Sequence, residues 1–117
     1  MLTKNKLREI FDQYGFAPLK KLGANYLVDG NIRDKIIAAA DISKDDIVLE
    51  IGPGLGAVTI DLAGTGAEVI AVEKDKKACV ILGDLAGGDL PNLKIIHKDI
   101  LEFDLAALAG AKKIKVI

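Results

Sequence analysis

The sequence lacks the residues on which cross-linked and metal-bound small domains depend, since it has one cysteine and one histidine. Cys79 has no second thiol for a disulfide within the chain, and one Cys with one His cannot complete a structural zinc site. No segment reaches the roughly 18 consecutive apolar residues of a membrane-spanning helix, and the charged N-terminus lacks the apolar centre of a signal peptide. We therefore expect a soluble, cytoplasmic protein with no metal site and no membrane partner.

The chain also has almost no net charge, because 16 Lys and Arg residues stand against 17 Asp and Glu residues. This balance provides no overall attraction to nucleic acid, so any basic surface for RNA must be local. We interpret the pair Lys20 and Lys21 as solvated. Hydrophobic residues make up 50% of the 117 residues, which is enough for one domain with its own core.

The hydrophobic pattern predicts helices and strands in alternation. Strands are expected at short apolar runs rich in β-branched residues, namely Ile47–Ile51, Glu68–Glu73, Asn92–His97 and Lys113–Ile117. Helices are expected over 2–14, from a cap at Asp29 or Asn31 to Ala40, from Ala57 to Leu62 or Ala63, over 74–85 and, as a short turn, over 105–109. The first strand has the continuous apolar run of a strand buried on both faces. The alternation predicts an α/β fold with a parallel sheet and flanking helices.

The sequence ends on the fourth of these strands, at Ile117. Open α/β sheets bind ligands just beyond the carboxyl ends of their strands. Because no residue follows Ile117 to form such a loop, we expect a truncated sheet of four strands. The last strand would then be an edge with unpaired backbone groups, which favours self-association.

Three glycines, Gly52, Gly54 and Gly56, lie between the first predicted strand and the helix after it. Without Cβ atoms this turn can adopt positive φ and let a ligand lie on the main chain, beside the N–H groups of the helix. The spacing G-x-G-x-G differs from the dinucleotide fingerprint G-x-G-x-x-G, and together with Glu50 it fits S-adenosylmethionine better than a pyrophosphate. An NAD-dependent oxidoreductase is therefore disfavoured. The motif alone does not distinguish a cofactor site from an ordinary strand-to-helix turn that binds no ligand.

Acidic residues follow the next two predicted strands. Glu73 ends the second strand, where doubly wound folds place a carboxylate against ribose hydroxyls. Asp99 follows the third strand at the same level and can accept a hydrogen bond from an adenine amino group, with Ile100 beside the ring. An Asp after a strand is more often a turn former or a helix cap. The ligand role is supported instead by the position of Asp99 in register with the glycine-rich turn and Glu73. His97 and Cys79 are interpreted as structural, with Cys79 buried as a small hydrophobe.

The segments Glu50–Thr59 and Leu22–Asp29 resemble the N-terminal half of the bacterial small-subunit ribosomal RNA adenine N6,N6-dimethyltransferases. The resemblance covers essentially the whole chain. It implies a Rossmann-like class I methyltransferase core, S-adenosyl-L-methionine as cofactor and small-subunit ribosomal RNA as partner. It also implies that residues 1–28 form an N-terminal helix and a loop that caps the cofactor, and that residues 29–117 form the Rossmann-like half.

The same resemblance assigns contacts to the cofactor. Asn25 and Leu27 would wrap its methionine end, and the glycine-rich turn would contact it through the backbone of Gly52, Gly54 and Gly56. Glu73 would hold the ribose, Asp99 with Ile100 would hold the adenine, and Lys74 is a further cofactor-binding residue.

The chain departs from the family pattern at two places. Ala24 stands where the family usually has Gln, and Tyr26 replaces Phe. The catalytic N-L-P-Y motif of the family follows the fourth strand, so it lies beyond Ile117, and the C-terminal RNA-binding domain is absent too. We therefore expect the chain to bind cofactor without catalysing methyl transfer, because nothing would hold the attacking amine in line.

Two alternatives remain. The macrolide-resistance methyltransferases, which modify large-subunit RNA, belong to the same superfamily, but they are associated with Ser and Lys where this chain has Pro53 and Leu55. The other alternative is a non-catalytic, self-associating Rossmann-like module.

Overall fold

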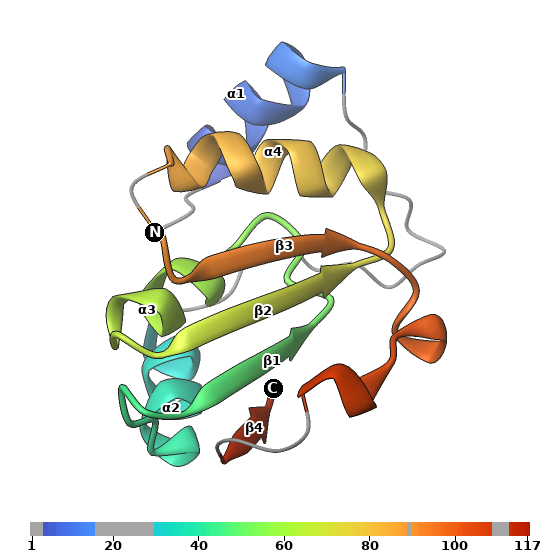
Figure 1. Ribbon diagram of the computed structural model, residues 1–117. Coiled ribbons are helices and arrows are strands. Elements are labelled where there is room, and N and C mark those ends of the chain that lie inside the picture. The colour runs from blue at the N-terminus through green and yellow to red at the C-terminus, as the bar shows by residue number, and fades with distance from the viewer. Residues whose placement is uncertain (1–3, 16–29, 89, 109–112) are drawn as a thin grey trace.

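The computed structural model describes residues 4–15, 30–88, 90–108 and 113–117, and the statements below concern this part of the chain. One parallel sheet contains the strands β1 Ile47–Ile51, β2 Glu68–Glu73, β3 Leu93–His97 and β4 Ile114–Val116. The α-helices are α1 Lys4–Tyr14, α2 Gly30–Ala40, α3 Thr59–Gly64 and α4 Lys76–Ala86. Two short 3-10 helices, η2 Ile100–Glu102 and η3 Leu105–Leu108, lie between β3 and β4. Figure 1 shows α1 lying along α4, on the side of α4 away from the strands.

The strands follow the order β3-β2-β1-β4 across the sheet, and every pair is parallel. From β1 the chain moves outward through α3 to β2 and through α4 to β3. It then returns to the other side of β1 to form β4 (Figure 1). The direction of winding therefore reverses between β1 and β4, which is the kind of position where open α/β sheets bind ligands.

Alternate side chains of the central strands point to opposite faces and build two cores. On one face Val48 and Val69 pack with Leu62 of α3 and with the half-buried Ile36 and Ile37 of α2. On the other face the strands contact the segment that contains η2 and η3. That second cluster consists of Ile47, Leu49, Ile70 and Val72, with Ile96, Ile100, Phe103 and Leu108 packed against it. The sheet is thus covered on both faces, as the continuous apolar run of β1 predicted.

The predicted fold class is confirmed, and the element ends differ for identifiable reasons. The helix expected from Lys74 begins at Lys76, because the Asp75 side chain accepts hydrogen bonds from the N–H groups of Lys77 and Ala78 and caps it. The helix expected from Ala57 begins at Thr59, after a turn. The 3-10 helix η2 was not predicted.

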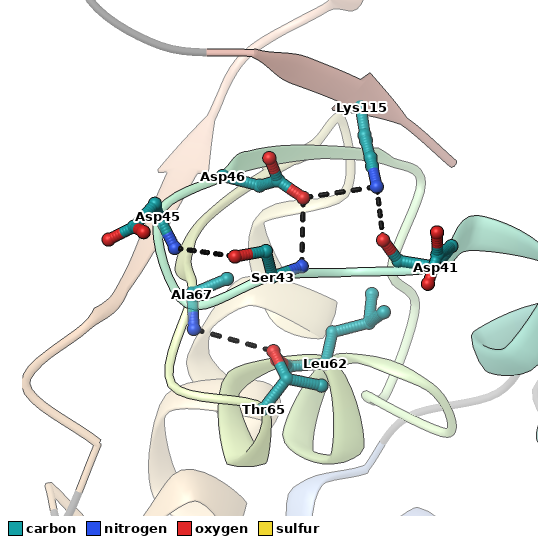
Figure 2. A network of polar contacts seen from close by, with 8 residues as sticks. All are labelled: Asp41, Ser43, Asp45, Asp46, Leu62, Thr65, Ala67 and Lys115. Carbon is teal, nitrogen blue, oxygen red and sulfur yellow. Dashed lines mark hydrogen bonds and ion pairs between the residues drawn. The ribbon is translucent and has the colours of Figure 1, made fainter.

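A polar network at the amino ends of the strands attaches β4 to the rest of the sheet (Figure 2). Lys115 Nζ of β4 lies 3.0 Å from Asp46 Oδ2 and also donates to the carbonyl oxygen of Asp41. The same Asp46 oxygen accepts a 2.8 Å hydrogen bond from Ser43 N, and this bond, followed by Lys115, lowers the pKa of Asp46. Because Asp46 directly precedes β1, the network fixes β4 beside the start of β1.

Within the described residues, no helix combines the length and the apolar character needed to cross a membrane.

Candidate cofactor site

The predicted site residues that the structure describes lie at the carboxyl ends of β1, β2 and β3. Strand pairing sets Ile51 opposite Val72 and Glu73 opposite His97, so these strands end side by side. The glycine-rich turn, Glu73 and Asp99 are therefore neighbours at one edge of the sheet, as expected from their places in the sequence.

The glycines of the turn have the backbone that the spacing predicted, with φ of 69° at Gly52, 59° at Gly54 and 90° at Gly56. Their surroundings differ. A Cβ atom at Gly52 would meet no heavy atom within 4 Å, whereas one at Gly56 would collide with the side chain of Leu82 in α4. Gly52 therefore leaves the main chain open on the outer side of the turn, and Gly56 allows close packing on α4.

The carboxylate of Glu73 is held against this turn by backbone N–H groups. Its Oε1 accepts a 3.2 Å hydrogen bond from Gly54 N, and its Oε2 accepts a 2.8 Å bond from Lys74 N. Oε2 also accepts a longer, 3.5 Å bond from Asp75 N. Each carboxylate oxygen has two lone pairs, so Oε1 can still accept a bond from a ligand hydroxyl. The structure thus fixes an acceptor for polar hydrogens next to the open main chain of Gly52.

Glu50, at the end of β1, is buried beneath the turn with 5% of its surface exposed. Its Oε2 accepts a 2.6 Å hydrogen bond from the hydroxyl of Thr59, the first residue of α3. Burial raises the pKa of Glu50 to about 7, the Thr59 bond opposes this rise, and the charge of Glu73 adds to it. Glu50 is recognisable from the sequence but Thr59 is not, because no local pattern marks a threonine as the partner of this carboxylate.

Asp99 is both a cap and a neighbour of the site. Its Oδ1 accepts a 3.0 Å hydrogen bond from Leu101 N at the start of η2, so Asp99 does cap a short helix. Its Oδ2 lies 3.6 Å from Lys74 Nζ, and this pair connects the ends of β2 and β3. Ile100 is half-buried and packs against the second core cluster.

His97 and Cys79 support the backbone around Lys74 and Glu73. His97 Nε2 lies 3.0 Å from the carbonyl oxygen of Lys74, which can only accept, so this nitrogen donates. The thiol of Cys79 lies 3.6 Å from the carbonyl oxygen of Glu73, and burial raises its pKa to about 11. The structural interpretation of His97 and Cys79 is consistent with these contacts, although Cys79 is half-buried rather than fully buried.

Asn25 and Leu27, the other predicted contacts, lie outside the described residues.

A parallel sheet in this order, with a glycine-rich turn after β1 and an acidic residue after β2, is the Rossmann-like fold of S-adenosylmethionine-dependent methyltransferases. Two solved methyltransferase structures are similar to the chain. A dimethyladenosine transferase from Plasmodium falciparum is 35% identical, with a TM-score of 0.57, over 61% of this chain and 27% of its own. The 23S rRNA methyltransferase ErmE is 31% identical, with a TM-score of 0.63, over 68% of this chain and 32% of its own.

The chain belongs to the ribosomal RNA adenine dimethylase family, since the family model of that description matches residues 16–116. A curated relative, Ribosomal RNA small subunit methyltransferase A of Pelotomaculum thermopropionicum, is 46% identical over 106 residues. This match covers 91% of the chain and 36% of the relative, so the chain spans about a third of the length of that protein. The family resemblance stated from the sequence is therefore confirmed.

Proposed function

We propose that the chain binds S-adenosyl-L-methionine at the carboxyl ends of β1, β2 and β3, as the cofactor-binding part of an enzyme that dimethylates adenines of small-subunit ribosomal RNA. The observation that carries the proposal is the carboxylate of Glu73, fixed by Gly54 N and Lys74 N beside the open main chain of Gly52. A nucleoside lying on Gly52 would place its ribose hydroxyls at this carboxylate.

The remaining contacts follow from the same placement. Asp99 keeps 30% of its side chain exposed and accepts from the adenine amino group, while Ile100 contacts the ring. Lys74 contacts the ribose end, and Gly54 and Gly56 shape the turn beneath the cofactor. Asn25 and Leu27 are proposed to cover the methionine end, within an N-terminal segment 1–28 that caps the site.

The cofactor supplies a methyl group on a sulfonium, and the residues of this chain bind and orient it. Hydrogen bonds to the charged carboxylate of Glu73 are each worth about 1.5–3 kcal/mol, so this residue contributes strongly to affinity. The chain spans about 36% of the length of its relative. We therefore propose cofactor binding for this chain, and methyl transfer and RNA recognition for a protein as long as the relative. The cytoplasm, where ribosomes are assembled in bacteria, is the proposed location.

A large-subunit RNA substrate is the second candidate, because ErmE shares the fold at 31% identity. Pro53 and Leu55 favour the small-subunit substrate, as does the 46% identity to a small-subunit methyltransferase. We also propose that the chain self-associates through β4, which lies at the edge of the sheet with Val116 60% exposed.

Isothermal titration with S-adenosyl-L-methionine tests the cofactor site. We expect saturable binding by the wild-type chain, and a loss of at least about tenfold in affinity for Glu73→Ala. Glu68→Ala is the matched control, because Glu68 lies at the amino end of the same strand, away from the site, and this variant should bind normally. A folded wild-type chain that does not bind, or equal binding by Glu73→Ala, would overturn the proposal. NADH, titrated in parallel, should not bind.

A further inference from the structure

The side chain of Leu55 connects the glycine-rich turn to two helices. Leu55 lies between Gly54 and Gly56, and only 1% of its surface is exposed. It belongs to a buried cluster with Ile10 of α1 and with Ala78 and Ile81 of α4. The turn is therefore open to a ligand on one side, at Gly52, and anchored in an apolar cluster through Leu55.

The helix α1 contributes Ile10 to this cluster. Among its described side chains, Ile10 is the buried one, at 2% exposure, while Phe11 and Tyr14 are half-buried. Figure 1 shows α1 on the outer side of α4. Its share in the cluster of Leu55 therefore depends on how α1 docks on α4.

Two polar contacts fix the C-terminal end of α1 on α4. The hydroxyl of Tyr14 donates a 2.6 Å hydrogen bond to Asp84 Oδ2, and Lys77 Nζ donates a 3.2 Å bond to the carbonyl oxygen of Gly15. Lys77 and Asp84 lie two turns apart on α4, so Tyr14 and Gly15 are held at two points along it. An apolar pocket lined by Tyr14, Lys76, Lys77, Val80 and Ile81 remains at this seam. The seam between α1 and α4 thus combines polar contacts at Tyr14 and Gly15 with an apolar pocket.

A turn with three glycines at positive φ needs such an anchor. Glycine loses more conformational freedom on ordering than any other residue, and Gly52, Gly54 and Gly56 all adopt left-handed backbone. Where contacts do not fix the turn in advance, a ligand that lies on it must spend binding energy to order it. Leu55 is a side chain within the turn that is buried in a cluster with residues of α1 and α4.

We propose that α1 is a positioning element of the cofactor site, acting through the buried cluster that Ile10 shares with Leu55. This inference rests on the proposed function, because the ligand is the cofactor assigned above. Docked α1 holds Leu55 in the apolar cluster and keeps the Gly54 N–H directed at Glu73. By thermodynamic reciprocity, a cofactor that binds the ordered turn also stabilises the docked position of α1.

The first test compares cofactor affinities of variants by isothermal titration at a temperature where all are folded. Ile10→Ala should bind S-adenosyl-L-methionine at least about 5-fold more weakly than the wild type, and Ile10→Val should recover most of the loss. Ile42→Ala is the matched control, because Ile42 is half-buried, packs against the separate cluster that contains Val48 and Leu62, and should retain wild-type affinity. Should Ile10→Ala not fold, Tyr14→Phe replaces it, since this change removes the bond to Asp84 and leaves the ring in place.

The second test uses a signal that a purely structural role of α1 would not change. Amide hydrogen exchange across α1 should slow when S-adenosyl-L-methionine is added to the wild type, and should not respond in Ile10→Ala. Cofactor binding with unchanged exchange in α1 and equal affinity in the variants would overturn this inference alone. A wild-type chain that does not bind the cofactor would instead overturn the proposed function on which it rests.

Discussion

The hydroxyl of Thr59 donates a 2.6 Å hydrogen bond to Oε2 of Glu50, and both side chains are buried beneath the glycine-rich turn. This bond joins the end of β1 to the start of α3, the two elements between which the turn is held. It also partly compensates the cost of burying the Glu50 carboxylate, whose pKa is still raised to about 7. The support of the turn therefore depends on a group that titrates near neutral pH.

This arrangement predicts a pH-dependent stability. The unfolded chain releases the Glu50 proton near the ordinary value of 4.5, whereas the folded chain keeps it until about 7. Between these values the folded state binds more protons, so the free energy of unfolding should fall as pH rises, by at most roughly 3 kcal/mol, and then level off. Glu50→Gln should remove this slope in urea unfolding measured between about pH 4.5 and about pH 8. Glu68→Gln is the control, and a slope that persists in Glu50→Gln would assign it to another group.

The glycines of the turn should respond differently to alanine. Gly56→Ala introduces a Cβ that collides with Leu82 at a φ of 90°, so we expect a loss of about 2 kcal/mol or more in stability. Gly52→Ala meets no atom within 4 Å and should cost about 1 kcal/mol, yet it places a methyl group on the open side of the turn and should weaken cofactor binding. Thermal unfolding and titration of both variants measure the two effects. Equal losses of stability would contradict this assignment.

The two roles of Asp99 can be separated by substitution. Asp99→Ser keeps an oxygen that accepts from Leu101 N, whereas Asp99→Ala removes the cap of η2 and should cost about 1 kcal/mol. If Asp99 also accepts from the adenine, both variants should lose cofactor affinity, although the serine variant keeps its stability. Titration with S-adenosyl-L-methionine and thermal unfolding give the two readouts. Wild-type affinity in Asp99→Ser would show that Asp99 caps η2 and does not bind the cofactor.

Self-association through β4 is testable by sedimentation at high protein concentration. Val116 is 60% exposed on this edge strand, and a lysine at such a position opposes pairing with a second chain. Val116→Lys should therefore shift the chain toward monomer. Val80→Lys is the control, because Val80 is 52% exposed on α4 and not on a strand. A wild-type chain that stays monomeric would contradict the prediction.

Much of the fold followed from short-range patterns. β1 was predicted at its observed bounds because its apolar, β-branched run is typical of a strand buried on both faces. The position of Glu73 at the end of β2 was also predictable, since the apolar run of β2 stops immediately before this residue. The start of α4 was displaced by a local cap, and η2 was missed because three residues carry no helical period.

The sequence by itself determined the alternation of helices and strands, the glycine spacing and the acidic residues at the strand ends, because these depend on periodicity and backbone sterics between near neighbours. Only the tertiary structure decided that Thr59 bonds to Glu50, that Gly52 is open while Gly56 packs on α4, and that Ile10 and Leu55 share a buried cluster. These contacts join residues whose approach depends on how whole elements pack. Burial then sets their energies, since a pKa near 7 for Glu50 arises from desolvation that no local pattern encodes.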